Sequence, residues 1–217
     1  MTTEEYIEGH IDPEPAYLHA LWRATHLHLN YPRMASGHVQ GSVLRMLTRM
    51  IRPRRVLELG TFSGYSTLCM ASALEGDGMV HTVEVHDEQA LFTRPWLEGS
   101  PWAERICLHV GDALTLLDAP DSGLPDELDM VFIDADKRQY VDYYHAVLPR
   151  MRRGGFILAD NTLWGGHVTE PTVRDSDAQT HGILAFNDLV AADVRVERVI
   201  LPVRDGLTLI RVVEPPL

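Results

Sequence analysis

Two short apolar segments, Val131–Ile133 and Phe156–Ala159, each end in oxygen-bearing side chains. Asp134 follows the first segment, and Asp160 and Asn161 follow the second. About one strand-helix unit separates the two segments, which is the spacing of consecutive strands in a parallel sheet. Because open parallel sheets bind ligands at the carboxyl ends of their strands, this pattern predicts an α/β fold with a site along one edge of the sheet.

Asp134, Asp160 and Asn161 would converge if the two segments form neighbouring strands, since adjacent strands lie roughly 5 Å apart. Two carboxylates and one amide oxygen suit Mg²⁺, which takes oxygen ligands in an octahedron and keeps positions open for water or substrate oxygens. We therefore predict that these residues bind Mg²⁺ or another divalent cation.

Lys137 is the only lysine among the 19 basic residues of the chain. A genome that favours arginine codons explains the arginines, but it does not explain why the exception lies three residues after Asp134. Arginine keeps its proton near neutral pH, whereas a lysine can release one if nearby positive charge or burial lowers its pKa. We favour a chemical role for Lys137 over the alternative of an exposed residue at a helix N-terminus.

Length and composition limit the class of protein. The 217 residues, of which 45% are hydrophobic, fit a single domain (residues 1–217), with an N-terminal helical cap over residues 1–50 and an α/β core over residues 51–217. No apolar run approaches the roughly 20 residues that a membrane helix needs, and Met1–Glu5 is acidic where a secretory signal is basic. We therefore expect a cytoplasmic protein with no membrane partner. The formal net charge of -12 also disfavours nucleic acid as a partner.

A strand, a glycine turn and a helix follow one another near residue 60. Arg55–Gly60 has the pattern of a buried strand, and the turn through Gly64 leads into a helix that is expected to reach about Leu74. Glycines let a ligand approach the backbone, and the free N–H groups of the helix N-terminus face that ligand. The pattern predicts a nucleotide-type binding corner, with an ordinary tight turn as the alternative.

The next predicted strand, Met79–Glu84, ends in an acid placed 24 residues after Gly60. An acid at this position can accept hydrogen bonds from both hydroxyls of a ribose, in dehydrogenases and in other nucleoside-binding proteins. Gly60 and Gly64 are four residues apart, which does not fit the G-x-G-x-x-G fingerprint of dinucleotide binders. A nicotinamide-dependent dehydrogenase is therefore a disfavoured alternative.

The remaining elements alternate between helices and strands. Helices are expected over residues 3–11, 15–26, 138–148 and 181–192, around residues 39–47 and from residue 87, and strands over residues 105–110, 194–203 and 207–213. Arg204–Gly206 alone joins the last two strands, so they must be antiparallel. Asp112 fits an adenine contact and a helix N-cap equally well, and Ser36 is expected to N-cap the third helix. Cys69 and Cys107 fall in a predicted helix and strand, so we expect reduced core residues and no disulfide.

Taken together, these motifs resemble those of the cation-dependent S-adenosylmethionine O-methyltransferases, a family that includes catechol and caffeoyl-coenzyme A O-methyltransferases. The resemblance runs from about Met34 to Val213. Its carriers, in chain order, are Glu58-Leu59-Gly60-Thr61-x-x-Gly64-Tyr65-Ser66, Glu84, Gly111-Asp112-Ala113, Ile133-Asp134-Ala135-Asp136-Lys137, Asp160-Asn161 and Asp205-Gly206-Leu207-Thr208. Each motif is weak alone, but their order and spacing together are specific.

The resemblance implies a Rossmann-like class I methyltransferase fold, with a seven-stranded, mostly parallel sheet, an antiparallel last strand and helices on both faces. It also implies methyl transfer from S-adenosylmethionine to one hydroxyl of a catechol-like vicinal diol, with catalysis by Lys137 as base and by Asp134, and a homodimer. The cation ligands of the family correspond to Asp134, Asp160 and Asn161. The implied cofactor-binding residues are Met34, Ser36, Glu58, Gly60, Thr61, Ser66, Glu84, Asp112, Asp134 and Asp136.

The sequence departs from the family pattern at three places. Thr93–Gly99 replaces an Asn-x-x-x-Ala-Gly pattern, Gly37 replaces the proline after Ser36, and the loop Thr169–Thr180 matches no known element. Because that loop and the N-terminal helices shape the acceptor pocket, the identity of the methyl acceptor stays open. We keep as alternatives a hydroxylated uridine in transfer RNA, which two arginine clusters could bind, and a non-catalytic nucleoside-binding protein, which the retained cation ligands and lysine disfavour. The clusters are Arg52–Arg55 and Arg150–Arg153.

Overall fold

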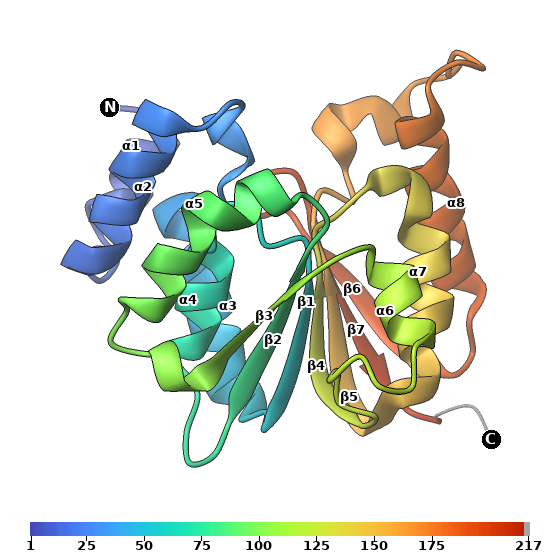
Figure 1. Cartoon of the computed structure of the whole chain (residues 1–217). Coiled ribbons are helices and arrows are strands. Elements are labelled where there is room, and N and C mark those ends of the chain that lie inside the picture. The colour runs from blue at the N-terminus through green and yellow to red at the C-terminus, as the bar shows by residue number, and fades with distance from the viewer. Residues whose placement is uncertain (215–217) are drawn as a thin grey trace.

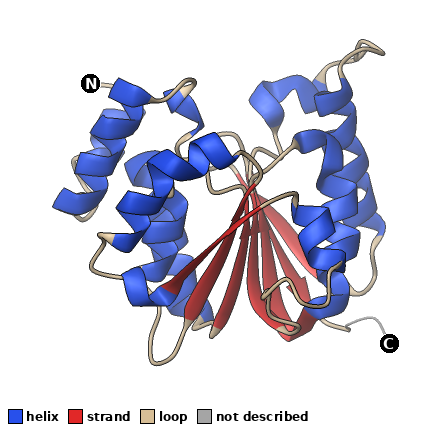
Figure 2. Ribbon diagram, in the orientation of Figure 1, coloured by secondary structure: helices blue, strands red, loops and turns tan. Residues whose placement is uncertain are grey.

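The computed structural model describes residues 1–214. A seven-stranded sheet in the order β3-β2-β1-β4-β5-β7-β6 forms its centre, with helices on both faces (Figures 1 and 2). The strands are β1 (Arg55–Leu59), β2 (Met79–Glu84), β3 (Ile106–Val110), β4 (Leu128–Ile133), β5 (Met151–Ala159), β6 (Val196–Leu201) and β7 (Leu207–Val212). This architecture confirms the expected fold class.

Strands β1 to β5 pair in parallel, whereas β7 pairs antiparallel with both β5 and β6. The antiparallel hairpin predicted from its short turn is therefore confirmed. Strands β4 and β5 are neighbours, with Ile133 opposite Ala159 in the register. Asp134 and Asp160 consequently leave the sheet side by side at the same edge.

Two helical layers cover the sheet (Figure 1). On one face, α3 (Gly37–Ile51) and α4 (Tyr65–Ala71) pack directly on the strands through Leu44 and Met70. The helix α5 (Asp87–Glu98) completes this layer. On the other face lie α6 (Ala113–Asp118), α7 (Tyr140–Val147) and α8 (Ala178–Ala192), which share a core with residues of β1, β4, β5 and β7. Within residues 1–214, no helix is both long enough and apolar enough to cross a membrane.

The N-terminal helices α1 (Thr3–Glu8) and α2 (Ala16–His28) lie outside the α3–α5 layer (Figure 1). Leu18 and Leu21 of α2 are buried against Tyr65 and Leu68 of α4. The segment therefore covers a helical layer, while α3, which sequence reasoning grouped with it, belongs to the layer that packs on the sheet. Within residues 1–214, short 3₁₀ helices connect the elements at Pro32–Met34, Ala103–Arg105, Lys137–Gln139, Leu148–Arg150 and Trp164–Thr169.

The local structure differs from the predicted one at several places. Helix α8 begins three residues before the predicted start, because the Asp177 side chain accepts hydrogen bonds from the backbone N–H and the hydroxyl of Thr180. Strand β5 begins at Met151, five residues earlier than the apolar segment indicated. Ser36 occupies the N-cap position of α3, but its hydroxyl makes no capping hydrogen bond, so that expectation was wrong.

Candidate active site

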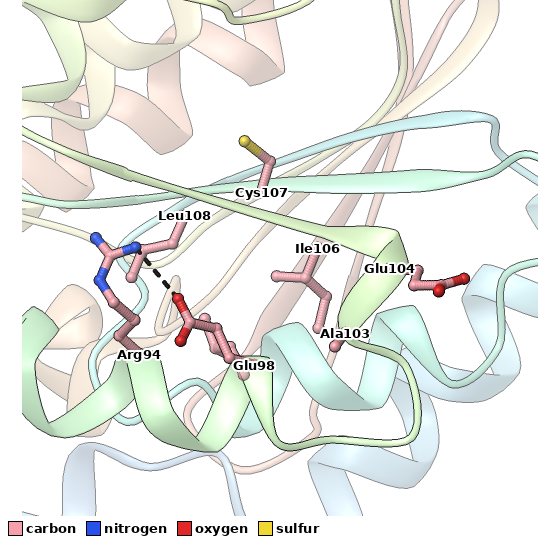
Figure 3. Close-up of a pocket in the computed structure, with 8 residues that line it drawn as sticks. Arg94, Glu98, Ala103, Glu104, Ile106, Cys107 and Leu108 are labelled. Carbon is pink, nitrogen blue, oxygen red and sulfur yellow. Dashed lines mark ion pairs between the residues drawn. The ribbon is translucent and has the colours of Figure 1, made fainter.

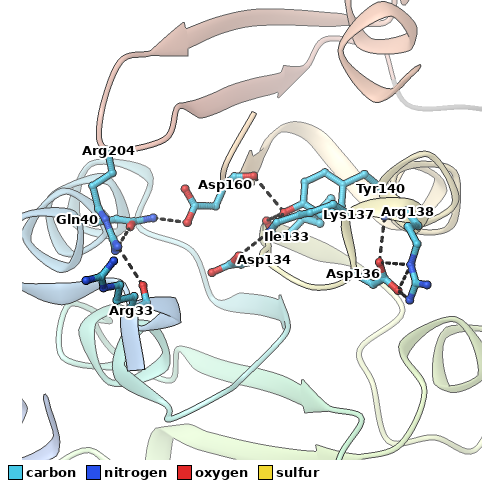
Figure 4. Close-up of polar contacts among 10 residues, drawn as sticks. All are labelled: Arg33, Gln40, Ile133, Asp134, Asp136, Lys137, Arg138, Tyr140, Asp160 and Arg204. Carbon is cyan, nitrogen blue, oxygen red and sulfur yellow. Dashed lines mark hydrogen bonds and ion pairs between the residues drawn. The ribbon is translucent and has the colours of Figure 1, made fainter. Parts of the chain in front are cut away.

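The carboxyl ends of β4 and β5 bring Asp134 and Asp160 together, as the sequence predicted. The Asp160 backbone N–H donates a 3.0 Å hydrogen bond to the carbonyl of Ile133, and the Tyr140 hydroxyl lies 3.1 Å from the carbonyls of both Ile133 and Asp160. Tyr140 is fully buried, so its hydroxyl links the two strand ends from inside the protein. Figure 4 shows both carboxylates pointing toward the side on which Gln40 lies.

Lys137 is buried beside this pair of carboxylates and is not an exposed residue at a helix start. Its Nζ donates to Asp134 Oδ1 at 2.8 Å and to the Tyr140 hydroxyl at 2.7 Å. The 3₁₀ turn Lys137–Gln139 that precedes α7 aims the side chain back at the strand ends. The lone lysine of the chain is therefore placed next to the group that the sequence predicted for cation binding.

Asp160 has the properties of a cation ligand. One oxygen, Oδ2, accepts a 2.6 Å hydrogen bond from Gln40 Nε2, while the other, Oδ1, is buried and has no hydrogen-bond partner among the described residues. Burial, followed by repulsion from the Asp134 carboxylate, raises the pKa of Asp160. A buried carboxylate oxygen without a donor is costly unless a positive group meets it, so this donor set fits a hard divalent cation.

Asn161 follows Asp160 and is half-buried in a left-handed conformation with φ of 57°. Asparagine tolerates this conformation better than most residues. Its backbone carbonyl accepts a hydrogen bond from the Trp164 N–H, which starts the 3₁₀ turn of the following loop. Asn161 thus lies at the same sheet edge as the two aspartates, and its role as a ligand stays a prediction.

Arg204 links the acidic cluster to the segment before α3. Its Nη1 donates at 3.0 Å to the carbonyl of Ala35 and at 3.0 Å to Gln40 Oε1, and it also contacts the carbonyl of Ser36. Gln40 in turn donates to Asp160, so a chain of contacts runs from the β6–β7 turn through α3 to the end of β5 (Figure 4). Sequence reasoning missed both Arg204 and Gln40.

The glycine turn after β1 lies directly against the end of β4. Gly60 has φ of 99°, and a Cβ atom at this position would lie 2.2 Å from the carbonyl oxygen of Asp134. Only glycine fits such a close backbone approach. A narrow cleft follows this turn, and several predicted residues line it together with Phe62, Ser63 and Tyr65. The predicted residues that it brings together are Met34, Ser36, Gly60, Thr61, Ser66 and Asp134.

Glu84 is buried at the end of β2, on the far side of the glycine turn from the aspartates. Its Oε2 accepts a 2.8 Å hydrogen bond from the backbone N–H of Phe62, and its Oε1 accepts one of 3.0 Å from that of His86. These bonds fix the carboxylate beside the turn. Each oxygen keeps a lone pair that can accept a further hydrogen bond, and the contact with a ribose stays a prediction.

A hydrogen bond joins Ser66 to Glu58 below the cleft. The Glu58 carboxylate is fully buried and accepts hydrogen bonds from Ser66 Oγ at 2.5 Å, from Thr82 Oγ1 at 2.6 Å and from the Thr67 hydroxyl. Burial raises the pKa of Glu58 to about 7, although the three hydroxyls oppose that change. The geometry gives Glu58 a role in holding the glycine turn and the start of α4.

Asp112 and Asp136 each accept hydrogen bonds from a residue close to them in the sequence. Asp112 Oδ1 accepts 2.8 Å hydrogen bonds from the backbone N–H and hydroxyl of Thr115, so it is an N-cap of α6, and a contact with adenine stays a prediction. Asp136 accepts two hydrogen bonds of 2.9 Å from Arg138 Nε, and the Arg138 guanidinium lowers its pKa. In Figure 4 this ion pair lies on the other side of Lys137 from Asp160.

Comparison with known proteins agrees with this geometry. The family model described as O-methyltransferase matches residues 8–213. The chain belongs to this O-methyltransferase family. It is 34% identical over 185 residues to caffeoyl-CoA O-methyltransferase 1 of Eucalyptus globulus, covering 82% of this chain and 74% of that protein. It is 31% identical over 204 residues to the caffeoyl-CoA O-methyltransferase of Stellaria longipes, covering 91% and 84%.

Solved structures of bacterial O-methyltransferases share the whole fold. The O-methyltransferase of Bacillus cereus, solved in complex with SAH, has a TM-score of 0.88 with 29% identity and covers 96% of each chain. The O-methyltransferase TomG of Streptomyces achromogenes, solved with SAM, has a TM-score of 0.85 with 31% identity and covers 99% of this chain and all of the other. This O-methyltransferase is therefore an S-adenosylmethionine-dependent enzyme, and the dehydrogenase and non-catalytic alternatives are excluded.

Proposed function

We propose that this O-methyltransferase transfers a methyl group from S-adenosylmethionine to one hydroxyl of a catechol-like vicinal diol on a small molecule, with Mg²⁺ held by Asp134, Asp160 and Asn161. The observation that carries the proposal is the buried, unpartnered Oδ1 of Asp160 beside the Asp134 carboxylate. Two adjacent acids with one orphaned oxygen favour a dication, because ordinary hydrogen bonds leave the pair unsatisfied.

A divalent cation at this position supplies positive charge that favours the ionised form of an acceptor hydroxyl. Asp134 and Asp160 supply the charge that retains the cation. A vicinal diol is the acceptor that suits such a site, since its two oxygens can fill the positions that the protein ligands leave open. Two plant relatives are named as caffeoyl-CoA O-methyltransferases, which supports an aromatic diol as the acceptor class.

Lys137 is the base in this proposal. Its Nζ lies between Asp134 Oδ1 and the Tyr140 hydroxyl, so its position is fixed by two hydrogen bonds at the edge of the acidic cluster. A general base must lie within hydrogen-bond reach of the proton that it removes. Lys137 would accept the proton of the attacking hydroxyl, and Asp134 would orient the amine.

The cleft beside the glycine turn is the proposed cofactor site. Glu84 would hold the ribose hydroxyls, the backbone at Gly60 and Thr61 would lie along the cofactor, and Met34 and Ser36 would flank its methionine part. Ser66 and Glu58 would support the turn from below, through the 2.5 Å hydrogen bond that joins them. Asp112 and Asp136 are proposed to contact the cofactor from the other side of the turn, and Phe62 and Trp164 to provide apolar walls.

A hydroxylated uridine of transfer RNA is the less favoured acceptor. The two arginine clusters do meet, since Asp129 accepts hydrogen bonds from the backbone of Arg54 and Arg55 and from the Arg152 side chain. They lie where β1 and β5 begin, at the opposite sheet edge from Asp134 and Asp160. Arg54 also pairs with Asp77 at 3.1 Å. Arginines that are neutralised by carboxylates at the far edge are poorly placed to bind a polyanion near the site.

The experiment that tests the proposal is a screen of methyl acceptors with labelled S-adenosylmethionine, with and without a chelator. Catechols and caffeoyl esters are expected to accept the label in the presence of Mg²⁺, and EDTA is expected to abolish transfer while cofactor binding persists. Full activity in metal-free protein would contradict the cation site. Methylation of transfer RNA without methylation of any diol would instead favour the second acceptor.

We further propose a cytoplasmic homodimer.

A further inference from the structure

A cluster of metal-ligating side chains lies outside the candidate active site, on the edge strand β3 and its neighbour β2. His81 of β2 is opposite Cys107 of β3 in the parallel register, and His109 follows Cys107 by two residues on the same face. One ligand atom from each residue lies within 4.8 Å of the others, and the three side chains are half-buried. The register of the two strands therefore brings two imidazoles and a thiol to one point.

This cluster is on the sheet face that α6, α7 and α8 cover, because His81 shares its face with Val83 of that core. Figure 3 shows the Cys107 side chain pointing to the opposite side of β3 from Leu108. Leu108 lines a shallow hollow of about 450 Å³ beside α5, where Arg94 and Glu98 form an ion pair of 3.7 Å. Cys107 also belongs to the lining of that hollow, but its side chain points to the other face of the strand, where it meets His81 and His109.

The distance between the two histidine nitrogens is close to that of a tetrahedral zinc centre. His81 Nδ1 lies 3.1 Å from His109 Nε2, with the rings stacked at 5.3 Å between their centroids. Two nitrogen ligands of a tetrahedral Zn²⁺, each about 2.0–2.1 Å from the ion, are separated by roughly 3.3 Å. A change of a few tenths of an ångström would thus admit the ion in place of the hydrogen bond between the two rings.

We propose that His81, Cys107 and His109 form a zinc-binding site, with a fourth ligand position open to water or an external ligand. Imidazole nitrogen and thiolate sulfur are ligands that favour Zn²⁺ over Mg²⁺, so the site selects a different ion from the oxygen donors Asp134 and Asp160.

The proposed zinc site is separate from the candidate active site but close to the proposed cofactor cleft. Strand β1 lies between β2 and β4, so the cluster is at least two strand spacings, roughly 10 Å, from Asp134. His81 precedes Glu84 by three residues, and His109 precedes Asp112 by three. An ion that joins β3 to β2 would therefore hold together the two strands that lead to these acids, and it would raise the stability of the edge strand β3.

Cobalt binding to the chelator-treated full-length protein tests this proposal, because Co²⁺ reports sulfur ligation by its absorbance. One equivalent of Co²⁺ is expected to give the charge-transfer band of a thiolate-cobalt bond, and Zn²⁺ is expected to remove that band. The band should be lost in Cys107→Ser and retained in the matched control Cys69→Ser, whose thiol is buried elsewhere. His109→Gln should weaken cobalt binding by at least about tenfold.

Two further results separate this site from the proposed Mg²⁺ site. Asp160→Asn should keep the thiolate-cobalt band, so loss of Mg²⁺-dependent activity in that variant leaves the zinc site intact. Zn²⁺ should raise the Tm of the wild-type protein by several degrees but leave that of Cys107→Ser unchanged. No charge-transfer band in the wild type, or a band that persists in a folded Cys107→Ser protein, would overturn the proposal. The three side chains would then be a hydrogen-bonded histidine pair beside a thiol.

Discussion

Gln40 Nε2 donates a 2.6 Å hydrogen bond to Asp160 Oδ2, joining two buried residues that are 120 positions apart in the sequence. The same amide accepts a hydrogen bond from Arg204 Nη1 through its oxygen. Gln40 is therefore held in one orientation from both sides, and it fixes which oxygen of Asp160 remains free. Such a partner would position Asp160 for the proposed Mg²⁺ without touching the ion.

Gln40→Leu should weaken Mg²⁺ binding by about 10- to 100-fold, because Asp160 would lose the donor that orients it. The Mg²⁺ concentration that gives half-maximal activity, measured alongside a calorimetric titration of Mg²⁺, reports this change. Gln139→Leu is the matched control, since Gln139 accepts a hydrogen bond only from the Tyr143 hydroxyl and lies outside the acidic cluster. Equal Mg²⁺ affinities in the two variants would show that Gln40 serves packing alone.

Lys137→Arg should lower kcat by on the order of 10²-fold, because arginine keeps the charge but does not release its proton. Cofactor and Mg²⁺ affinities should change little, and Arg138→Lys, on the exposed neighbouring position, should keep full activity. The comparison is made on one acceptor by steady-state kinetics from pH 6 to 9. The same kcat for wild type and Lys137→Arg over that range would remove Lys137 from the role of base.

Glu84→Ala should weaken the binding of S-adenosylmethionine by about 1–3 kcal/mol, the cost of leaving charge-assisted hydrogen bonds unmade. Calorimetry measures the Kd, and thermal unfolding shows whether loss of the hydrogen bond to the Phe62 N–H also loosens the turn. Glu88→Ala changes an exposed acid on the adjacent helix and should leave the Kd unchanged. If Glu84→Ala binds the cofactor as tightly as the wild type, Glu84 is no part of the cofactor site.

Asp193→Asn should destabilise the fold at pH 7 by about 1–3 kcal/mol, because Asp193 accepts hydrogen bonds from Arg195 and from the buried Tyr144 hydroxyl. The Arg195 guanidinium holds the pKa of Asp193 well below its usual range. The charged carboxylate therefore stabilises the protein at pH values above the unfolded-state pKa of about 3.9, and this stabilisation is lost as the pH falls toward the folded-state pKa.

Thermal unfolding of the wild type and Asp193→Asn from pH 7 to 3 checks that sign. The difference in Tm should be largest near neutral pH and should shrink below about pH 4. Glu197→Gln is the control, since Glu197 pairs with Arg211 at 2.9 Å on the exposed surface, where an ion pair contributes little. A Tm difference that stays constant over the whole range would show that the charge of Asp193 does not contribute.

The sequence alone determined the sheet, its last hairpin and the edge at which the acids gather. The apolar segments before Asp134 and Asp160 predict where two strands end, because an apolar segment and the polar residue that follows it are both features of the local sequence. The tight turn at Arg204–Gly206 likewise allows only an antiparallel pair, which the structure contains. Lys137 could be singled out for a similar reason, because the sequence alone shows that it is the one lysine of the chain.

Only the tertiary structure decided which side chains serve those acids. Gln40 and Arg204 are more than one hundred residues apart in the sequence, and no local pattern links either of them to Asp160. The one available signal for Gln40 was a polar residue on a helix face that is otherwise apolar. Asp112 fitted two roles in the sequence, and its 2.8 Å bond from the Thr115 N–H shows the N-cap, while the contact with adenine stays a prediction.

The cluster of His81, Cys107 and His109 shows the same limit. Each strand was predicted, but the register between β2 and β3 places His81 opposite Cys107, and a shift by one residue would have sent these side chains to opposite faces. Strand pairing is set by packing across the whole sheet, whereas strand formation follows from the alternation within each segment. The sequence thus determined the elements and their polar ends, and the packing of the sheet and its helices determined which of those ends meet.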